Sequence, residues 1–228
     1  MKLSVLLPVY NESKTLLDLL DRVGEVDLDK EIVLVDDYST DGTRELLKEK
    51  VENVREGVRV FYHPRNMGKG SAVRTALENA MGDYCIIQDA DLEYDPFDYK
   101  PLFEYVRENG CEVIYGSRFL KTWRSTSPWH FAVNKFLTVL TNILFGGTLT
   151  DMETCYKMVR TDLMRSLDLK AERFELEPEI TAKILKKGYR IPEIPISYRG
   201  RGYDEGKKIT WKDGVEAVLI LFRMRFLR

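Results

Sequence analysis

The sequence predicts an α/β fold in which helices flank a mostly parallel, Rossmann-like sheet. Three observations support this prediction. Short apolar runs alternate with helix-like stretches through the first half of the chain, as βαβ units require. The runs are apolar throughout rather than at every second residue, which is typical of strands covered on both faces. Polar motifs follow several of these runs, at the end of the strands where parallel sheets bind their ligands.

The regular alternation fills the first half of the chain. Its first helix is expected to begin at Asn11, a common helix-capping residue type, and to bury leucines such as Leu16 and Leu20. Gly82 is placed to end the third helix. We expect strands at 3–9, 31–35, 58–62, 84–88 and 113–116, and further helices at 43–50 and 71–81.

The second half is less regular, and no repeat or linker divides it from the first. A polar, glycine-rich and basic loop occupies 199–208. We therefore expect one domain over residues 1–228. The remaining patterns predict helices at 132–144, 176–187 and 211–226, and a strand at 193–198.

Composition excludes several classes of function. The 35 basic and 37 acidic residues give a net charge of -2, whereas nucleic-acid-binding proteins usually show a basic excess. Three scattered cysteines favour a reducing compartment. Pro8 interrupts the first apolar run too early for a secretory signal, and no segment offers the ~20 clean apolar residues of a spanning helix. A cytoplasmic location is expected.

Paired acids follow the fourth expected strand. Asp89 and Asp91 can converge on one divalent cation, Mg²⁺ or Mn²⁺, with phosphate oxygens completing its shell. Glu93 can add a third oxygen. Such acids also solvate loops or cap helices, and this reading fits Asp95, which precedes Pro96.

The ends of the first two strands carry further polar groups. The carboxylate of Asp36 or Asp37 can accept a hydrogen bond from the imide of uracil or guanine, or from a ribose hydroxyl. The neighbouring 39–41 segment also reads as a simple turn before a helix. Tyr10 can stack on a base, and Asn11 can serve as a cap.

Cations accompany these acids. The glycine-flanked turn at 63–71 can place a row of backbone amides and Lys69 near an anion, although it lacks the first glycine of a phosphate-binding Walker loop. Arg118, Arg201 and Lys207 are further candidate phosphate partners. Nothing in the sequence makes His63 or His130 a ligand or a base.

The order of these motifs resembles the inverting family 2 glycosyltransferases of the GT-A fold. The series is Pro-x-Tyr-Asn-Glu, Val-Asp-Asp-x-Ser-x-Asp-Gly-Thr, Asn-x-Gly-Lys-Gly, Asp-x-Asp and Gly-Ser-Arg. The resemblance extends from about Lys2 to Trp211. It is nearest to the branch that transfers mannose or glucose to dolichyl or polyprenyl phosphate.

The resemblance implies a role for each motif. Residues 1–118 become the nucleotide-binding half and 119–228 the acceptor-side half. Nucleotide contacts are implied at Pro8, Tyr10, Glu12, Val35 and Asp37. Metal and diphosphate contacts are implied at Asp89, Ala90, Asp91 and Glu93, phosphate contacts at Arg118, Arg201 and Lys207, and a position near the donor sugar at Glu177.

The implied reaction moves a hexose from a GDP- or UDP-sugar, with Asp91 and Arg118 stabilising the departing diphosphate. The acceptor decides whether a base is needed. A hydroxyl must lose its proton, and Asp151 is the best candidate base. A lipid phosphate, whose second pKa is about 6, is already nucleophilic.

Apolar segments favour the lipid acceptor. Residues 131–145 are rich in large apolar side chains, and 219–228 mix apolar residues with cations, as membrane-surface helices do. Both can also be core helices. We expect peripheral contact with the cytoplasmic face of a membrane.

Other readings remain open. A soluble family 2 enzyme with a hydroxyl acceptor and Asp151 as base is the main alternative. A polysaccharide synthase normally has a Gln-x-x-Arg-Trp motif, and a nucleotidyltransferase a glycine- and arginine-rich first loop; this chain has neither. A non-catalytic nucleotide-sugar-binding protein is the alternative from another class.

Overall fold

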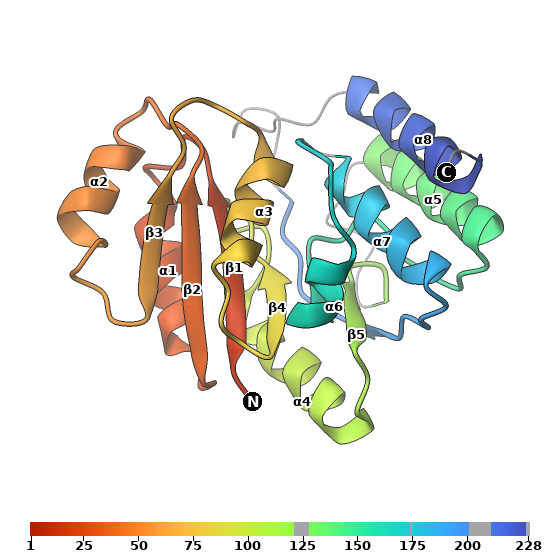
Figure 1. Ribbon diagram of the computed structural model, residues 1–228, viewed down its shortest axis with the longest axis horizontal. Helices are drawn as coiled ribbons and strands as arrows, with labels where there is room; N and C mark the ends of the chain where they lie inside the picture. The colour runs from red at the N-terminus through yellow and green to blue at the C-terminus, as the bar shows by residue number, and fades with distance from the viewer. Residues whose placement is uncertain (121–127, 174, 201–210, 227–228) are drawn as a thin grey trace.

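A seven-stranded sheet with helices on both faces forms the centre of the computed structural model, which describes residues 1–228 apart from 121–127, 174, 201–210 and 227–228 (Figure 1). The strand order is β3-β2-β1-β4-β6-β5-β7. The strands are β1 Leu3–Val9, β2 Lys30–Asp36, β3 Val58–Tyr62, β4 Tyr84–Ile87, β5 Val113–Ser117, β6 Lys157–Arg160 and β7 Glu193–Pro195.

The sheet is mostly parallel, as predicted, with one reversed strand. β1 pairs in parallel with both β2 and β4, and β2 pairs in parallel with β3. β6 runs antiparallel to both of its neighbours, β4 and β5. β6 was not predicted because four residues that include Lys157 and Arg160 show neither an apolar run nor an alternation.

Helices lie on either side of this sheet, and α5, α7 and α8 lie together to the right of β5 in the view of Figure 1. The predicted bounds of α2 and α8 are confirmed, while α3 begins two residues earlier than predicted and α4 and α6 were not predicted. The helices are α1 Leu16–Glu25, α2 Thr43–Lys50, α3 Lys69–Glu78, α4 Tyr99–Asn109, α5 Pro128–Phe145, α6 Thr161–Ser166, α7 Leu176–Lys186 and α8 Trp211–Phe226, with a 3₁₀ turn, η1, at Pro96–Asp98.

Several predicted element ends are wrong. α3 ends at Glu78, with Asn79 as its cap, so Gly82 does not end it. Asn11 does not begin α1, because its backbone adopts a left-handed conformation with φ 55° and its side-chain oxygen accepts a hydrogen bond from the Thr40 N–H. The last strand ends at Pro195 rather than Tyr198, which instead forms an isolated antiparallel bridge with Tyr94. The predicted cap at Asp95 is confirmed, since its side chain accepts from the Phe97 N–H.

The core forms where the apolar runs of the sheet meet the helices. Leu16, Leu19, Leu20 and Val23 of α1 recur at helical spacing and are buried. Each buried side chain of this size contributes about 1.5–3 kcal/mol relative to an exposed one. Packing of this kind fixes the loops at the carboxyl ends of the strands.

Two glycines allow an unusually close approach between distant segments. A Cβ on Gly68 or Gly70 would overlap the main chain of Glu172 or Ala171, respectively. The Ser71 N–H donates to the Glu172 carbonyl at 3.3 Å. The first turn of α3 therefore contacts the segment that leads into α7 with no side chain between them.

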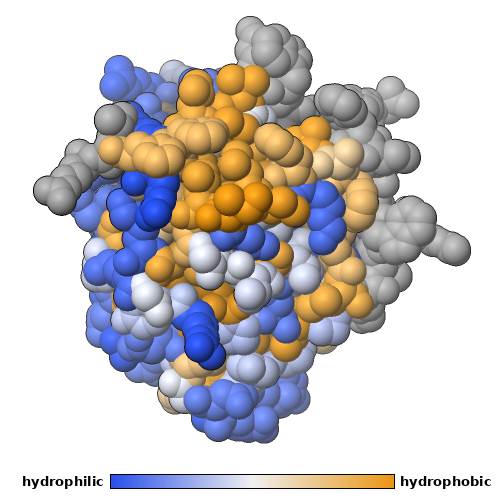
Figure 2. Space-filling model, turned by 90° about the vertical axis from the view of Figure 1, so that its right-hand side faces the viewer, coloured by the Kyte–Doolittle hydropathy of each residue, from blue (hydrophilic) through white to orange (hydrophobic). Residues whose placement is uncertain are grey.

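The surface formed by α5 and α8 is strongly apolar. The two helices pack side by side, and Figure 2 shows apolar side chains gathered on this side of the molecule. We call the exposed set the apolar face; it comprises Phe136, Val139 and Ile143 of α5 and Val215, Leu219, Phe222 and Phe226 of α8. In the described parts of the chain, no helix has both the length and the apolar character to cross a bilayer.

Substituting Gly70 by alanine should lower the free energy of unfolding by about 1–3 kcal/mol, because the added methyl group overlaps a carbonyl oxygen that cannot rotate away. Gly24, in α1, is the matched control, since nothing lies within 4 Å of the position that a Cβ would take there. Gly24→Ala should be neutral or stabilise by up to about 1 kcal/mol. Urea denaturation measures both, and equal effects would contradict the close contact.

Candidate functional site

Three adjacent strands bring the expected donor-side residues to one edge of the sheet. β2, β1 and β4 are neighbours and parallel, so the residues that follow them, Asp37, Tyr10 and Asp89, share that edge. Pro8 and Val35 are register partners on β1 and β2. This placement agrees with the sequence-based expectation.

The loops after β1 and β4 are joined through Thr15. Its hydroxyl lies 2.9 Å from Glu12 Oε2 and 2.8 Å from the carbonyl oxygen of Ala90. The Glu12 N–H donates to Thr43 Oγ1 at 3.0 Å, which adds the start of α2. Glu12 and Ala90 are thus held in one cluster, while Tyr10 remains exposed at the rim.

Asp37 organises the turn before α3. Its buried carboxylate accepts hydrogen bonds from His63 Nδ1 at 2.7 Å, from the Met67 N–H at 2.8 Å and from the Gly68 N–H at 2.7 Å. The prediction that these amides face an anionic ligand is therefore wrong for Met67 and Gly68, because the protein's own carboxylate uses them. His63, to which the sequence assigned no role, is a buried partner of Asp37.

Lys69 joins the two halves of the chain. Its ammonium lies 2.8 Å from Asp89 Oδ1 and 2.9 Å from Glu177 Oε1, on the first turn of α7. Burial would lower the pKa of Lys69, but the charge of Asp89, with that of Glu177, raises it well above its ordinary value. Lys69 is therefore a fixed positive charge beside the paired acids.

The expected metal trio is only partly assembled. Among the described residues, no three His, Cys, Asp or Glu side chains are placed to hold an ion together. Asp91 Oδ1 accepts from the Glu93 N–H at 3.1 Å, while Glu93 Oε2 accepts from the Tyr198 hydroxyl at 2.6 Å. Asp89 and Asp91 alone still fit Mg²⁺ or Mn²⁺, because Mg²⁺ is commonly held by one or two carboxylates together with substrate phosphates.

A buried network supports the main chain of Asp89. Gln88 donates from Nε2 to the Asp89 carbonyl at 2.8 Å. Its side-chain oxygen accepts from the hydroxyl of Tyr156 at 2.6 Å and from that of Tyr99. In the sequence, the one sign of this network was that a polar residue, Gln88, follows the apolar run at 84–87.

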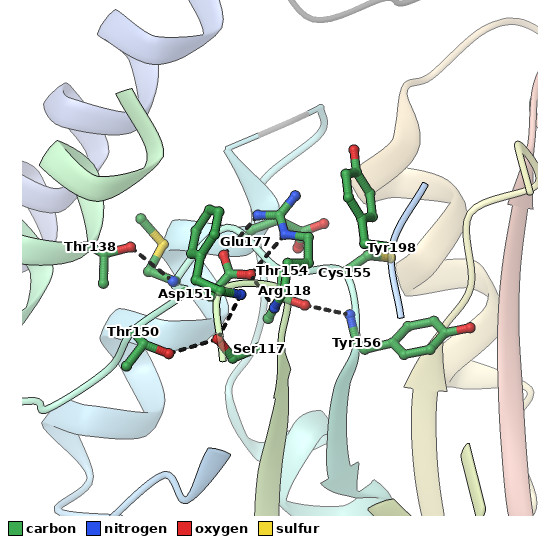
Figure 3. Close-up of polar contacts among 12 residues, drawn as sticks. Ser117, Arg118, Thr138, Thr150, Asp151, Thr154, Cys155, Tyr156, Glu177 and Tyr198 are labelled. Atoms are coloured by element: carbon green, nitrogen blue, oxygen red, sulfur yellow. Dashed lines mark hydrogen bonds and ion pairs between the residues drawn. The ribbon is translucent and has the colours of Figure 1, made fainter. Parts of the chain in front are cut away.

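Arg118 and Asp151 form a buried, two-pronged ion pair (Figure 3). Arg118 Nε and Nη2 each lie 2.7 Å from a different Asp151 oxygen, and the Arg118 N–H adds a third bond at 3.0 Å. Burial opposes the charge of Arg118, yet Asp151 raises the pKa of Arg118 well above its ordinary value. Asp151 is fully buried, so in this geometry it is a counter-ion with no oxygen open to an incoming hydroxyl.

Two further charged groups, Lys157 and Glu153, belong to the same part of the chain as Asp151. Lys157 is fully buried, 3.9 Å from Glu177 Oε2, and burial lowers its pKa. Burial also raises the pKa of Glu153 to about 7, against the charge of nearby Lys157 and with that of Glu177. Sequence reasoning missed both residues; charges inside the otherwise apolar 152–159 segment were the available signal. Arg201 and Lys207 lie outside the described residues.

Comparison with known proteins identifies related sequences. The family model described as "Glycosyl transferase family 2" matches residues 4–167. A dolichol-phosphate mannosyltransferase of Pyrococcus furiosus is 29% identical, over 91% of this chain and 59% of the relative. The low-salt glycan biosynthesis hexosyltransferase Agl6 of Haloferax volcanii is 30% identical, over 87% of this chain and 48% of the relative. The chain thus spans about half to three-fifths of these two proteins.

Solved structures show the same fold. Glucosyl-3-phosphoglycerate synthase of M. tuberculosis, in complex with Mn²⁺, UDP and glucosyl-3-phosphoglycerate, has a TM-score of 0.71 at 19% identity and matches all of this chain and 81% of that one. S. aureus TarS in complex with UDP-GlcNAc has a TM-score of 0.65 at 20% identity, over 98% of this chain and 66% of that one. The predicted GT-A fold is confirmed.

Glu153→Gln should remove a pH dependence of stability. The folded protein holds the Glu153 proton up to about pH 7, whereas the unfolded chain releases it near the ordinary value of 4.5. The free energy of unfolding of the wild type should therefore fall as pH rises from 4.5 to 7, by on the order of 2–3 kcal/mol. Urea denaturation across this range should show a smaller fall in the glutamine variant, and identical slopes would contradict the burial of this carboxyl.

Proposed function

Because the chain belongs to glycosyl transferase family 2, we propose that it transfers a hexose, mannose or glucose, with inversion from a GDP- or UDP-sugar to a polyprenyl or dolichyl phosphate. One observation carries the choice of acceptor. Asp151, the carboxylate expected to serve as a base, is fully buried and paired with Arg118. A lipid phosphate is the acceptor that needs no base.

On the donor side, Asp89 and Asp91 would hold Mg²⁺ or Mn²⁺, which when bound neutralises charge on the departing nucleotide diphosphate. Lys69 supplies a fixed cation 2.8 Å from Asp89 and keeps that carboxylate in place. Tyr10, exposed at the rim, is proposed to stack on the base, and Glu12 and Asp37 are proposed as further nucleotide contacts. Glu177 is proposed to lie near the donor sugar, because Lys69 links it to Asp89. Arg201 and Lys207 are proposed as further diphosphate partners.

On the acceptor side, Arg118 is the proposed phosphate partner. Asp151 uses two of the five guanidinium N–H groups through side-chain bonds and fixes the plane of the guanidinium. We propose that a second anion binds the remaining donors of Arg118, whose side chain is 8% exposed. In this proposal Asp151 positions Arg118 and takes no proton.

The apolar face supports a lipid acceptor. On α8 its residues recur at intervals of four, three and four, which places them along one stripe of the helix. The exposed cations Arg223 and Arg225 lie on either side of that stripe. Apolar side chains flanked by arginines are typical of helices that lie in the interface of an anionic membrane. We propose that the apolar face contacts the membrane that holds the acceptor.

A hydroxyl acceptor is the alternative, and one observation favours it. The pKa of Glu153, about 7, suits a general base at neutral pH better than the ion-paired Asp151 does. In this alternative the chain is a soluble family 2 enzyme, and Glu153 takes the proton in place of Asp151.

A panel of UDP- and GDP-sugars with a short polyprenyl phosphate should reveal transfer with Mg²⁺ or Mn²⁺ and none with EDTA. Asp91→Asn should lower kcat at least a hundredfold, because a carboxylate that binds the cation is lost, while the melting temperature stays close to that of the wild type. Undiminished transfer in EDTA would exclude the metal. Transfer to soluble hydroxyl acceptors alone would establish the alternative, and nucleotide-sugar binding without any transfer would indicate a binding protein.

Ile143→Asp combined with Leu219→Asp should reduce binding to anionic liposomes by at least tenfold, because each lost apolar contact costs about 1.5 kcal/mol or more. The two side chains are 75% and 63% exposed, so folding should be unaffected. Val54→Asp, on another surface and 64% exposed, is the matched control. Flotation on a density gradient measures the binding, and equal flotation of all three proteins would refute the membrane contact.

A further inference from the structure

Tyr198 lies where the chain after β7 meets the loop after β4, which we call the metal-binding loop because it carries Asp89, Asp91 and Glu93, the residues proposed for the cation. Its hydroxyl donates to Glu93 Oε2 at 2.6 Å. The adjoining main chain pairs as well, since the Arg199 N–H donates to the Glu93 carbonyl at 2.8 Å and Tyr198 bridges Tyr94. This pairing lies outside the main sheet and ties the loop after β4 to the acceptor-side half.

The ring of Tyr198 also faces Arg118. The guanidinium carbon lies 5.1 Å from the ring centre, within the range of a cation–π interaction. Tyr94 contacts the same ring edge-on at 5.1 Å and packs on Tyr156 at 4.7 Å, so the ring has little freedom to tilt. Arg118 thus donates from Nε and Nη2 to Asp151 and lies over the ring of Tyr198.

One side chain therefore touches both ends of the site. Both contacts belong to one rigid side chain, so a rotation of the Tyr198 ring changes its hydrogen bond to Glu93 and its contact with Arg118 together.

We propose that Tyr198 is a positioning residue that couples the metal-binding loop to Arg118, so that the donor end and the acceptor end of the site form together. The inference rests on the proposed function for the identity of the two ends. The inference means that Mn²⁺·nucleotide and a phosphate acceptor each bind more tightly when the other is bound. By linkage, the two affinities must rise by the same factor.

The test compares the wild type with Tyr198→Phe, which keeps the ring and removes the bond to Glu93, and with Tyr198→Leu, which removes both contacts. Tyr84→Phe is the matched control, because the Tyr84 hydroxyl donates to the Cys111 carbonyl at 2.7 Å, at the other end of β4. Mn²⁺ affinity with GDP or UDP is measured by electron paramagnetic resonance. Affinity for a short polyprenyl phosphate is measured by calorimetry, with and without Mn²⁺·nucleotide.

In the wild type and in Tyr84→Phe, Mn²⁺·nucleotide should tighten polyprenyl phosphate binding by about fivefold or more. Tyr198→Phe should abolish this enhancement and weaken Mn²⁺ binding by about three- to tenfold, while polyprenyl phosphate alone binds as in the wild type. Tyr198→Leu should also weaken polyprenyl phosphate binding alone, because Arg118 loses its contact with the Tyr198 ring and keeps that with Phe119, at 5.5 Å. Melting temperatures separate these effects from unfolding.

Wild-type coupling in Tyr198→Phe, or no coupling in the wild type, would overturn the inference while leaving the proposed function intact. If polyprenyl phosphate does not bind the wild type at all, the proposed acceptor is wrong. Tyr198 is then judged on Mn²⁺ affinity: unchanged binding in Tyr198→Phe overturns its role, and weakened binding supports it at the metal-binding loop.

Discussion

The ion triad of Lys69 with Asp89 and Glu177 is the interaction on which the arrangement of the site depends. Asp89 follows β4, Lys69 begins α3, and Glu177 lies in the first turn of α7, so three elements from both halves of the chain meet at one ammonium group. An unpaired buried charge is costly, and here each of the two carboxylates is stabilised by Lys69 and Lys69 by both of them. The position of α7 is thereby tied to the loop that carries the paired acids.

The rest of the site follows from the sheet. Parallel β2, β1 and β4 place their loops side by side, which gathers the donor-side residues, while the reversed strand β6 carries Lys157 and is preceded by Glu153. Arg118 follows β5, next to β6 in the sheet. The parallel part of the sheet therefore faces the nucleotide in the proposed reaction, and the part beyond β4 supplies the charges proposed for the acceptor.

The sequence predicted the parts of the structure that depend on local pattern. The apolar runs indicated β1 to β4, and the motif order indicated the family. It could not reveal pairings between distant residues: Arg118 and Asp151 are both visible as charged residues, but only folding shows that each neutralises the other. For the same reason β6 was missed, because a four-residue strand is defined by its partners rather than by its composition. Asn11 misled the prediction of α1 because the same residue type suits a cap and a left-handed turn.

The buried pair of Arg118 and Asp151 also restricts how this chain can diverge. Replacing one member alone leaves a bare charge in the interior, at a cost of about 3–5 kcal/mol, which is a large share of the stability of a typical domain. Replacing both by apolar residues of similar volume can be nearly neutral. Relatives of this chain that use a different acceptor should therefore carry substitutions at both positions together. A protein with only one of the two substitutions would be strongly destabilised.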